Sequence, residues 1–135
     1  MPAQKTVLIV EDEKSLREAL GVIFRLKNFT PLETGNGKEG VELALSKHPN
    51  IILLDLIMPE MDGMTALKKI RQDSWGANVP VVILTNVNAL SEQAADVLTT
   101  YKPIDYLIKS DCKIYDVIDK VENILEIQDT LLNKV

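Results

Sequence analysis

Five short runs of apolar and β-branched residues recur along the chain, at residues 6–10, 29–33, 51–54, 79–84 and 104–108. Runs of this length and composition are typical of strands, and the most apolar of them are typical of strands buried on both faces. Helical spacing fills the intervals, at residues 13–27, 38–47, 64–72 and 89–101 and from about residue 111 onward, where Asp111 or its neighbour can cap the helix. This alternation predicts an α/β domain with a five-stranded parallel sheet and helices on both faces.

The expected order of the strands is 2-1-3-4-5, one of the two common doubly wound orders. In that order the first and third strands are neighbours. The loop after the first strand carries Glu11 and Asp12, and the third strand is followed at once by Asp55. The topology therefore predicts that these carboxylates lie side by side.

Asp55 ends the apolar run Ile51–Leu54. A carboxylate is costly to remove from water unless the structure makes use of it. The carboxyl ends of parallel strands are where α/β sheets bind ligands, so Asp55 is the first candidate functional residue.

Three converging carboxylates repel one another strongly in a low-dielectric cleft. Either one of them is protonated or the group binds a cation, and an oxygen-only site half open to water suits Mg²⁺. A second interpretation stays open, in which Glu11 and Asp12 only stabilise the start of the first helix through its dipole.

The ends of the last two strands add complementary groups. Thr85 and Asn86 supply a hydroxyl and a backbone N–H, and Lys109 supplies an ammonium. Around a carboxylate and a cation, such donors make a receptor for a tetrahedral dianion. Taken singly, Thr85 could be an ordinary β-branched strand end, and Lys109 an edge lysine with its ammonium in solvent.

The chain resembles the receiver domains of response regulators in two-component signalling over nearly its whole length. The resemblance rests on Val10-Glu11-Asp12-Glu13, on Asp55 with Met58-Pro59-x-Met61-Asp62-Gly63, on Thr85, and on Tyr106-Leu107-Ile108-Lys109. It implies a flavodoxin-like fold. It also implies that Asp55 takes a phosphoryl group from the phosphohistidine of a histidine kinase or phosphotransfer protein, or from a small acyl or amidophosphate donor.

The resemblance also assigns roles to the neighbours of Asp55. Glu11, Asp12, Asp55 and the backbone carbonyl of Ile57 would bind Mg²⁺, with Mn²⁺ as an alternative. Thr85, Lys109 and the backbone N–H groups of Ile57 and Asn86 would hold the phosphoryl oxygens.

A switch follows from the same resemblance. The phosphoryl oxygens would give Thr85 a partner that it lacks beforehand, and Tyr106 would move into the space that Thr85 vacates. The alternative is that Tyr106 is a half-buried strand tyrosine with no gating role.

The chain departs from the family pattern at several positions. Glu11 replaces the commoner aspartate, and Asn86 replaces a small residue. Ser110 replaces the proline after Lys109, which removes the reason to expect a cis peptide bond. The loop at residues 102–105 lacks the usual small pair, which leaves its shape open.

Ile57 and Val87 are each two residues beyond a site residue and are apolar. Neither can hydrogen-bond an attacking water, so we expect slow self-dephosphorylation.

Residues 1–128 are expected to form the receiver domain, and residues 129–135 a helix extension or a frayed tail. No output domain is expected, so the signal would pass to a downstream protein or to a homodimer through residues 91–100, 105–108 and 113–122.

Fifteen basic against 20 acidic residues argue against direct DNA binding. One cysteine and the absence of a long apolar stretch favour the cytoplasm and argue against a membrane span.

Two alternatives remain open. The chain could be a pseudo-receiver, a binding module that works without phosphorylation. It could also be a small aspartyl-phosphate hydrolase, but such enzymes usually carry a second carboxylate where this chain has Ile57, so multiple-turnover catalysis is not expected.

Overall fold

A single parallel sheet organises the computed structural model, which describes residues 4–58, 60–86 and 91–132. Its strands are β1 (Thr6–Val10), β2 (Thr30–Thr34), β3 (Ile51–Leu54), β4 (Val81–Thr85) and β5 (Asp105–Ile108). They are ordered β2-β1-β3-β4-β5, with every pair parallel. The predicted fold class and strand order are confirmed.

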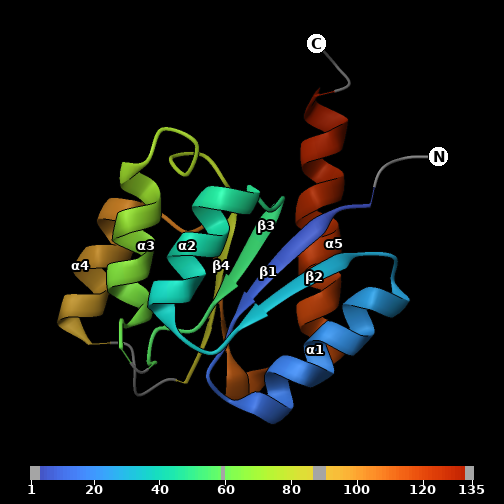
Figure 1. The fold of residues 1–135 in the computed structure, drawn as a ribbon, viewed down its shortest axis with the longest axis horizontal. Helices are drawn as coiled ribbons and strands as arrows, with labels where there is room; N and C mark the ends of the chain where they lie inside the picture. The colour runs from blue at the N-terminus through green and yellow to red at the C-terminus, as the bar shows by residue number, and fades with distance from the viewer. Residues whose placement is uncertain (1–3, 59, 87–90, 133–135) are drawn as a thin grey trace.

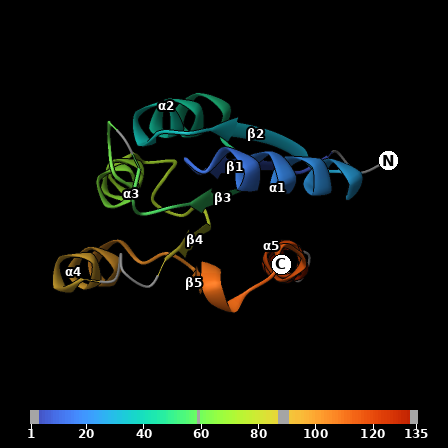
Figure 2. The same ribbon diagram turned by 90° about the horizontal axis from the view of Figure 1, so that it is seen from below.

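Helices cover both faces of the sheet. They are α1 (Lys14–Leu26), α2 (Gly37–Lys47), α3 (Gly63–Gln72), α4 (Glu92–Tyr101) and α5 (Ile114–Leu132), with a short 3₁₀ helix η2 (Lys109–Asp111) before α5. Helices α1 and α5 pack on one face, and α2, α3 and α4 pack on the other (Figures 1 and 2). Because each strand of the sheet centre is sandwiched, two apolar clusters form, one on each face.

Three strands begin later than the sequence predicts. Strand β5 begins at Asp105 and not at Ile104, and local hydrogen bonds give the reason for β2 and β4. The N–H of Phe29 donates to the carbonyl of Phe24 at 2.9 Å, so Phe29 ends the turn after α1 and β2 begins at Thr30. The carbonyl of Val79 accepts from Arg71 at 2.6 Å, and β4 begins at Val81.

The helix starts also refine the predictions. Ser91 caps α4 by accepting from the N–H of Ala94 at 3.1 Å, so α4 begins at Glu92. Ala89 and Leu90, where the sequence predicted its start, lie outside the described residues. At α5 the predicted cap Asp111 lies in η2 instead, and Asp116 accepts from the N–H of Lys113 at 2.7 Å.

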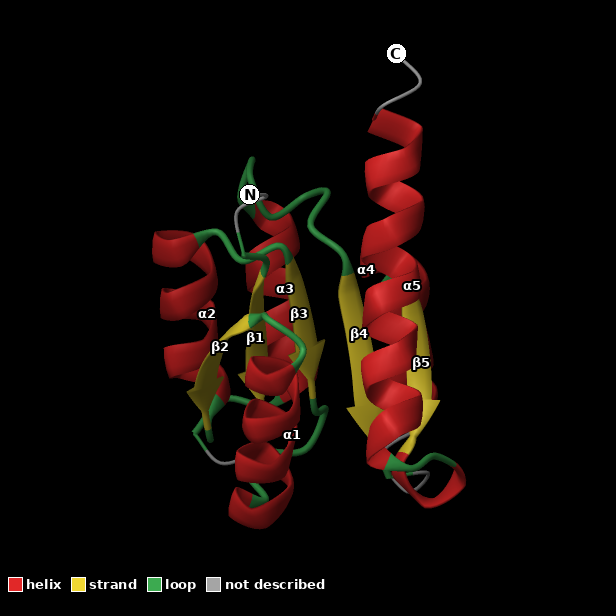
Figure 3. Ribbon diagram, turned by 90° about the vertical axis from the view of Figure 1, so that its right-hand side faces the viewer, coloured by secondary structure: helices red, strands yellow, loops and turns green. Residues whose placement is uncertain are grey.

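Helix α5 extends past the amino ends of the strands (Figure 3) and is described as helical through Leu132. An ion pair of 3.0 Å between Lys5 and Asp129 ties this part to the start of β1. Within the described residues, no helix is both long and apolar enough to cross a membrane.

The register of the sheet brings the strand ends together. Val10 pairs with Leu54, Leu54 with Ile83, and Thr85 with Ile108. The residues that follow β1, β3, β4 and β5 therefore leave the sheet at one edge, where the candidate site lies.

Candidate functional site

Asp55 lies at the centre of the site and is 5% exposed. Its backbone N–H donates to the carbonyl of Val10 at 3.0 Å, which continues the ladder between β1 and β3. Oδ1 accepts from the hydroxyl of Thr85 at 2.9 Å and from the N–H of Ile57 at 3.2 Å. Oδ2 accepts from Nζ of Lys109 at 3.1 Å. Three donors from three different strand ends thus converge on one carboxylate.

The hydroxyl of Thr85 already has a partner, which corrects the expectation that it lacks one before phosphorylation. Thr85 is 1% exposed and its hydroxyl donates to Asp55. The cause is the register together with burial, because Leu54 pairs with Ile83, so Thr85 lies one residue beyond the level of Asp55, and its side chain has no route to solvent. A phosphoryl group on Asp55 would therefore change the acceptor of Thr85 and not supply its first one.

The three predicted carboxylates also meet. Glu11, Asp12 and Asp55 each offer an oxygen within 4.8 Å of the others. Glu11 is 2% exposed, whereas Asp12 is exposed to solvent. Oxygen donors at this spacing, with one face open to water, fit Mg²⁺ or Mn²⁺.

Both oxygens of Glu11 are engaged by neighbouring groups. Oε2 accepts from the N–H of Glu13 at 3.0 Å, and Oε1 lies 2.7 Å from Nζ of Lys109. Apart from this ion pair, no described residue donates a hydrogen bond to Oε1, although the atom is buried. A buried oxygen with this free capacity supports the fit of a cation beside it.

Burial and neighbouring charges raise the pKa values of both Glu11 and Lys109. Burial raises the pKa of Glu11 from 4.5 to about 7, against the opposing effect of Lys109. Burial alone lowers the pKa of Lys109, but the hydrogen bonds and negative charges of Glu11 and Asp55 outweigh it, so the net pKa is raised. Lys109 is therefore a full ammonium at neutral pH.

The loop between β3 and α3 is fixed by the motif that follows Asp55. Met58 is buried, and Asp62 caps α3 by accepting from the N–H of Thr65 at 2.8 Å. A Cβ on Gly63 would clash with the carbonyl oxygen of Asp55, so this position has room only for glycine. Pro59 lies outside the described residues.

The two predicted backbone donors, Ile57 and Asn86, belong to the segments that follow β3 and β4. The N–H of Ile57 already points at Asp55, and the Ile57 side chain is 55% exposed. Asn86 follows β4 and is exposed. Val87, which is predicted to flank the mouth of the site together with Ile57, lies outside the described residues.

The segment around β5 differs from the family pattern in sequence but contains no cis peptide bond among its described residues. All peptide bonds between described residues are trans, including that between Lys109 and Ser110. The loop at residues 102–105, whose shape the sequence did not determine, turns through Lys102, whose φ is 34°.

Arg71 holds this turn from α3, a role that its sequence position did not signal. Its guanidinium donates to the carbonyls of Gly76, Val79, Tyr101 and Lys102 at 2.6–3.2 Å. Burial lowers the pKa of Arg71. This one side chain therefore links the end of α4 to the loop before β4.

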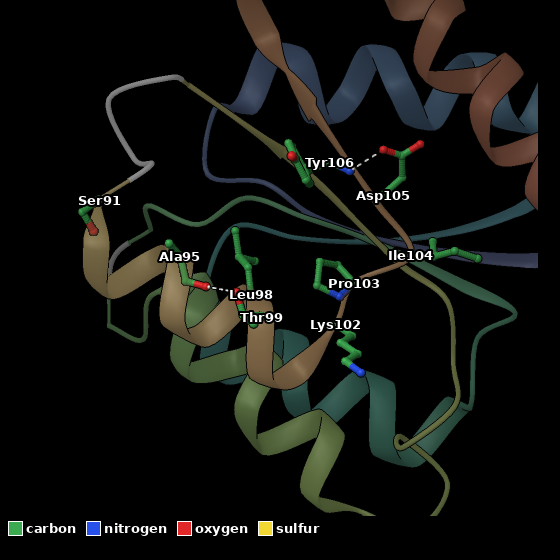
Figure 4. Close-up of a pocket in the computed structure, with 9 residues that line it drawn as sticks. All are labelled: Ser91, Ala95, Leu98, Thr99, Lys102, Pro103, Ile104, Asp105 and Tyr106. Carbon is green, nitrogen blue, oxygen red and sulfur yellow. Dashed lines mark hydrogen bonds between the residues drawn. The ribbon is translucent and has the colours of Figure 1, made fainter.

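Tyr106 lines the groove between α4 and β5 (Figure 4). The groove has a volume of about 620 Å³ and is lined by Ser91, Ala95, Leu98, Thr99, Lys102, Pro103, Ile104, Asp105 and Tyr106. Tyr106 is 57% exposed and Ile104 is 50% exposed. Of the two predicted switch residues, Thr85 is therefore buried and Tyr106 is exposed.

A doubly wound sheet with carboxylates and a lysine at its switch point belongs to the class of α/β domains that bind ligands at the carboxyl ends of their strands. A family model described as the response regulator receiver domain matches residues 7–128, and the chain belongs to this family.

Regulatory protein AtoC of Escherichia coli is 38% identical over 109 residues, which cover 81% of this chain and 23% of AtoC. The chain spans less than half the length of the curated relatives that it matches.

Two solved structures illustrate the likeness. A CheY-like receiver domain protein from Methanospirillum hungatei superposes with a TM-score of 0.83 at 19% identity, over 94% of this chain and 98% of that one. This likeness concerns the fold alone. The receiver domain of the sensor histidine kinase PA1611 from Pseudomonas aeruginosa has a TM-score of 0.77 at 25% identity, over 90% of this chain and 97% of that one. It carries a magnesium ion coordinated in its active-site cleft.

Proposed function

We propose that the chain is a phosphoacceptor switch in which Asp55 takes a phosphoryl group from a sensor histidine kinase, a phosphotransfer protein or a small acyl or amidophosphate donor. The convergence of Thr85, Ile57 and Lys109 on the Asp55 carboxylate carries this proposal. A site with a nucleophile, a hydroxyl, a backbone donor and an ammonium matches the needs of phosphoryl transfer, where positioning and charge neutralisation do most of the work.

Mg²⁺ or Mn²⁺ would be held by Glu11, Asp12, Asp55 and the carbonyl of Ile57. When bound, the cation would neutralise charge on the phosphoryl oxygens. A carboxylate oxygen of Asp55 attacks phosphorus while the bond to the donor nitrogen or oxygen breaks. Lys109, Thr85 and the N–H groups of Ile57 and Asn86 would receive the phosphoryl oxygens. Position 57 holds isoleucine and not a second carboxylate. The domain would therefore hydrolyse its own aspartyl phosphate slowly and would not act on other substrates.

The signal would leave through α4, β5 and the first half of α5, at residues 91–100, 105–108 and 113–122. The contact between Thr85 and Asp55 would be exchanged for one to the phosphoryl group, and Tyr106 would change its position along the groove. The exposed Tyr106 gives that surface an apolar side chain, and the exposed Ile104 lines the same groove beside it. A downstream protein or a second copy of the chain would bind there, with no direct contact to DNA.

The extent of the domain and its compartment belong to the same proposal. Residues 1–128 would form the receiver, and residues 129–135 an extension of it, of which residues 129–132 end α5. The reducing cytoplasm is expected because Cys112 has no second cysteine with which to pair.

A pseudo-receiver remains the second candidate, because Asn86 and Ser110 depart from the family pattern next to the site. Incubation with acetyl phosphate and Mg²⁺, followed by the mass of the intact protein, separates the two. The switch predicts a gain of one phosphoryl group that Asp55→Ala abolishes. An unchanged mass in the parent protein would favour the pseudo-receiver. Capture of partners with both forms then shows whether phosphorylation changes binding.

A further inference from the structure

The guanidinium of Arg17 lies behind the acidic loop and binds its backbone. Nη1 donates to the carbonyl of Glu11 at 2.7 Å and to that of Asp12 at 3.5 Å. Arg17 belongs to the first half of α1, so these bonds tie the loop to the helix that follows it. A charged donor on a carbonyl makes a stronger hydrogen bond than a neutral one.

Gly35 leaves the room that this guanidinium needs. A Cβ at residue 35 would lie 2.9 Å from Nη1 of Arg17 and 3.9 Å from Cα of Asp12. The φ of Gly35 is not positive, so alanine could adopt its backbone conformation. The close atom is the end of a flexible side chain. Gly35→Ala would therefore displace the guanidinium without breaking the fold.

Asp12 is the carboxylate that depends most on this support. Glu11 is held through its own side chain and through its N–H, which donates to the carbonyl of Thr34 at 3.0 Å. Among the described residues, no group donates a hydrogen bond to the exposed carboxylate of Asp12. Its place beside Glu11 and Asp55 is consequently set by the backbone that Arg17 holds.

We propose that Arg17 is a positioning residue for the cation site, and that Gly35 is required to seat it. The inference rests on the proposed function, since it concerns the same Mg²⁺ ligands. Arg17 touches neither the cation nor the phosphoryl group in this proposal. It fixes the carbonyls of Glu11 and Asp12 so that the Asp12 carboxylate meets the other two.

The test is the affinity of the full chain for Mg²⁺ alone, measured by titration calorimetry without a phosphodonor. Arg17→Met should weaken binding by about tenfold, the lower end of the usual effect of losing a group that supports metal ligands. Arg17→Lys should recover part of the loss, and Gly35→Ala should weaken binding although Arg17 is intact. Arg25→Met, an exposed position in the last turn of α1, is the matched control and should change nothing.

The sign of the change separates positioning from simple electrostatics. If Arg17 acted only as a nearby positive charge, Arg17→Met would tighten Mg²⁺ binding, and that result or an unchanged affinity would overturn the proposal. If Arg17→Met fails to fold, Gly35→Ala takes its place, and a tighter or unchanged Mg²⁺ affinity in that variant would overturn the proposal. A parent protein that does not bind Mg²⁺ would overturn both this inference and the cation in the proposed function. Normal binding in the parent with no effect of Arg17→Met or Gly35→Ala would overturn this inference alone.

Discussion

Nζ of Lys109 lies closer to Oε1 of Glu11, at 2.7 Å, than to Oδ2 of Asp55, at 3.1 Å. Lys109 therefore shares its charge between a proposed cation ligand and the proposed phosphoacceptor. The longer side chain of glutamate at position 11, where the family more often has aspartate, makes this contact part of the site. In the proposed function, the ammonium and Mg²⁺ would compete for the same oxygens.

Lys109→Met should bind Mg²⁺ more tightly than the parent protein. The expected gain is at least about 1 kcal/mol, the Coulomb energy of two unit charges some 4 Å apart even in bulk water. Titration calorimetry measures it, with the exposed Lys113→Met as the control. Equal or weaker binding in Lys109→Met would show that Lys109 and the cation do not compete.

Glu11 should make the stability of the protein fall as pH rises toward neutrality when no divalent cation is added. Its pKa is raised from 4.5 to about 7 in the folded state because the carboxylate is buried. A group with a raised pKa stabilises the fold fully below its unfolded pKa, and that contribution is lost between about pH 4.5 and pH 7.

The slope attributable to this one group is at most about 1.4 kcal/mol per pH unit. Urea unfolding of the parent and of Glu11→Gln across this range measures it as a difference, with Glu18→Gln as an exposed control. The parent should lose stability relative to Glu11→Gln as pH rises. Parallel curves would mean that Glu11 titrates normally.

Thr85→Val should destabilise the protein by about 1 kcal/mol, the usual net value of a buried hydrogen bond. The substitution keeps the shape of the side chain and removes the donor that lies 2.9 Å from Oδ1 of Asp55. Denaturant unfolding gives the value. Thr100→Val, whose hydroxyl bonds an α4 carbonyl at an exposed position, should cost less. A Thr85→Val protein as stable as the parent would argue that this bond adds nothing.

Ile57→Asn should shorten the lifetime of the phosphorylated protein. The Ile57 side chain is 55% exposed, so the change hardly disturbs the fold, and an amide at the mouth can orient a water. Release of phosphate should quicken by roughly tenfold, less than the roughly 10²–10⁴ of a full general base. Val87→Glu tests the other predicted flank, and Ile104→Asn on the α4–β5 groove is the control. If neither Ile57→Asn nor Val87→Glu is faster, apolar flanks do not set the lifetime.

The sheet was predictable because its central strands are apolar on both faces. The boundaries of β3 were predicted correctly, since Asn50 and Asp55 enclose an unbroken buried run. The predicted strand starts were wrong where a local hydrogen bond competes with the hydrogen bonds between strands, as at Phe29 and Val79. Sequence spacing does not reveal such bonds, because they depend on where a turn or a distant side chain lies.

The meeting of Glu11, Asp12, Asp55, Thr85 and Lys109 followed from counting strand ends. The individual contacts among these side chains could not be predicted in this way. The hydrogen bond from Thr85 to Asp55 and the ion pair of Glu11 with Lys109 depend on burial and side-chain rotamers. Arg17 and Arg71 escaped prediction for another reason. A basic residue within an amphipathic helix is most often solvated, and nothing in the sequence distinguishes one that binds backbone carbonyls.

The central claim is that Asp55 itself accepts the phosphoryl group. Reduction of the acetyl phosphate-treated protein with borohydride converts an aspartyl phosphate into homoserine, which peptide mass spectrometry can locate. The account predicts homoserine at residue 55, dependent on Mg²⁺ and on the phosphodonor. Homoserine at another carboxylate, or at none although the intact protein gains a phosphoryl group, would contradict it.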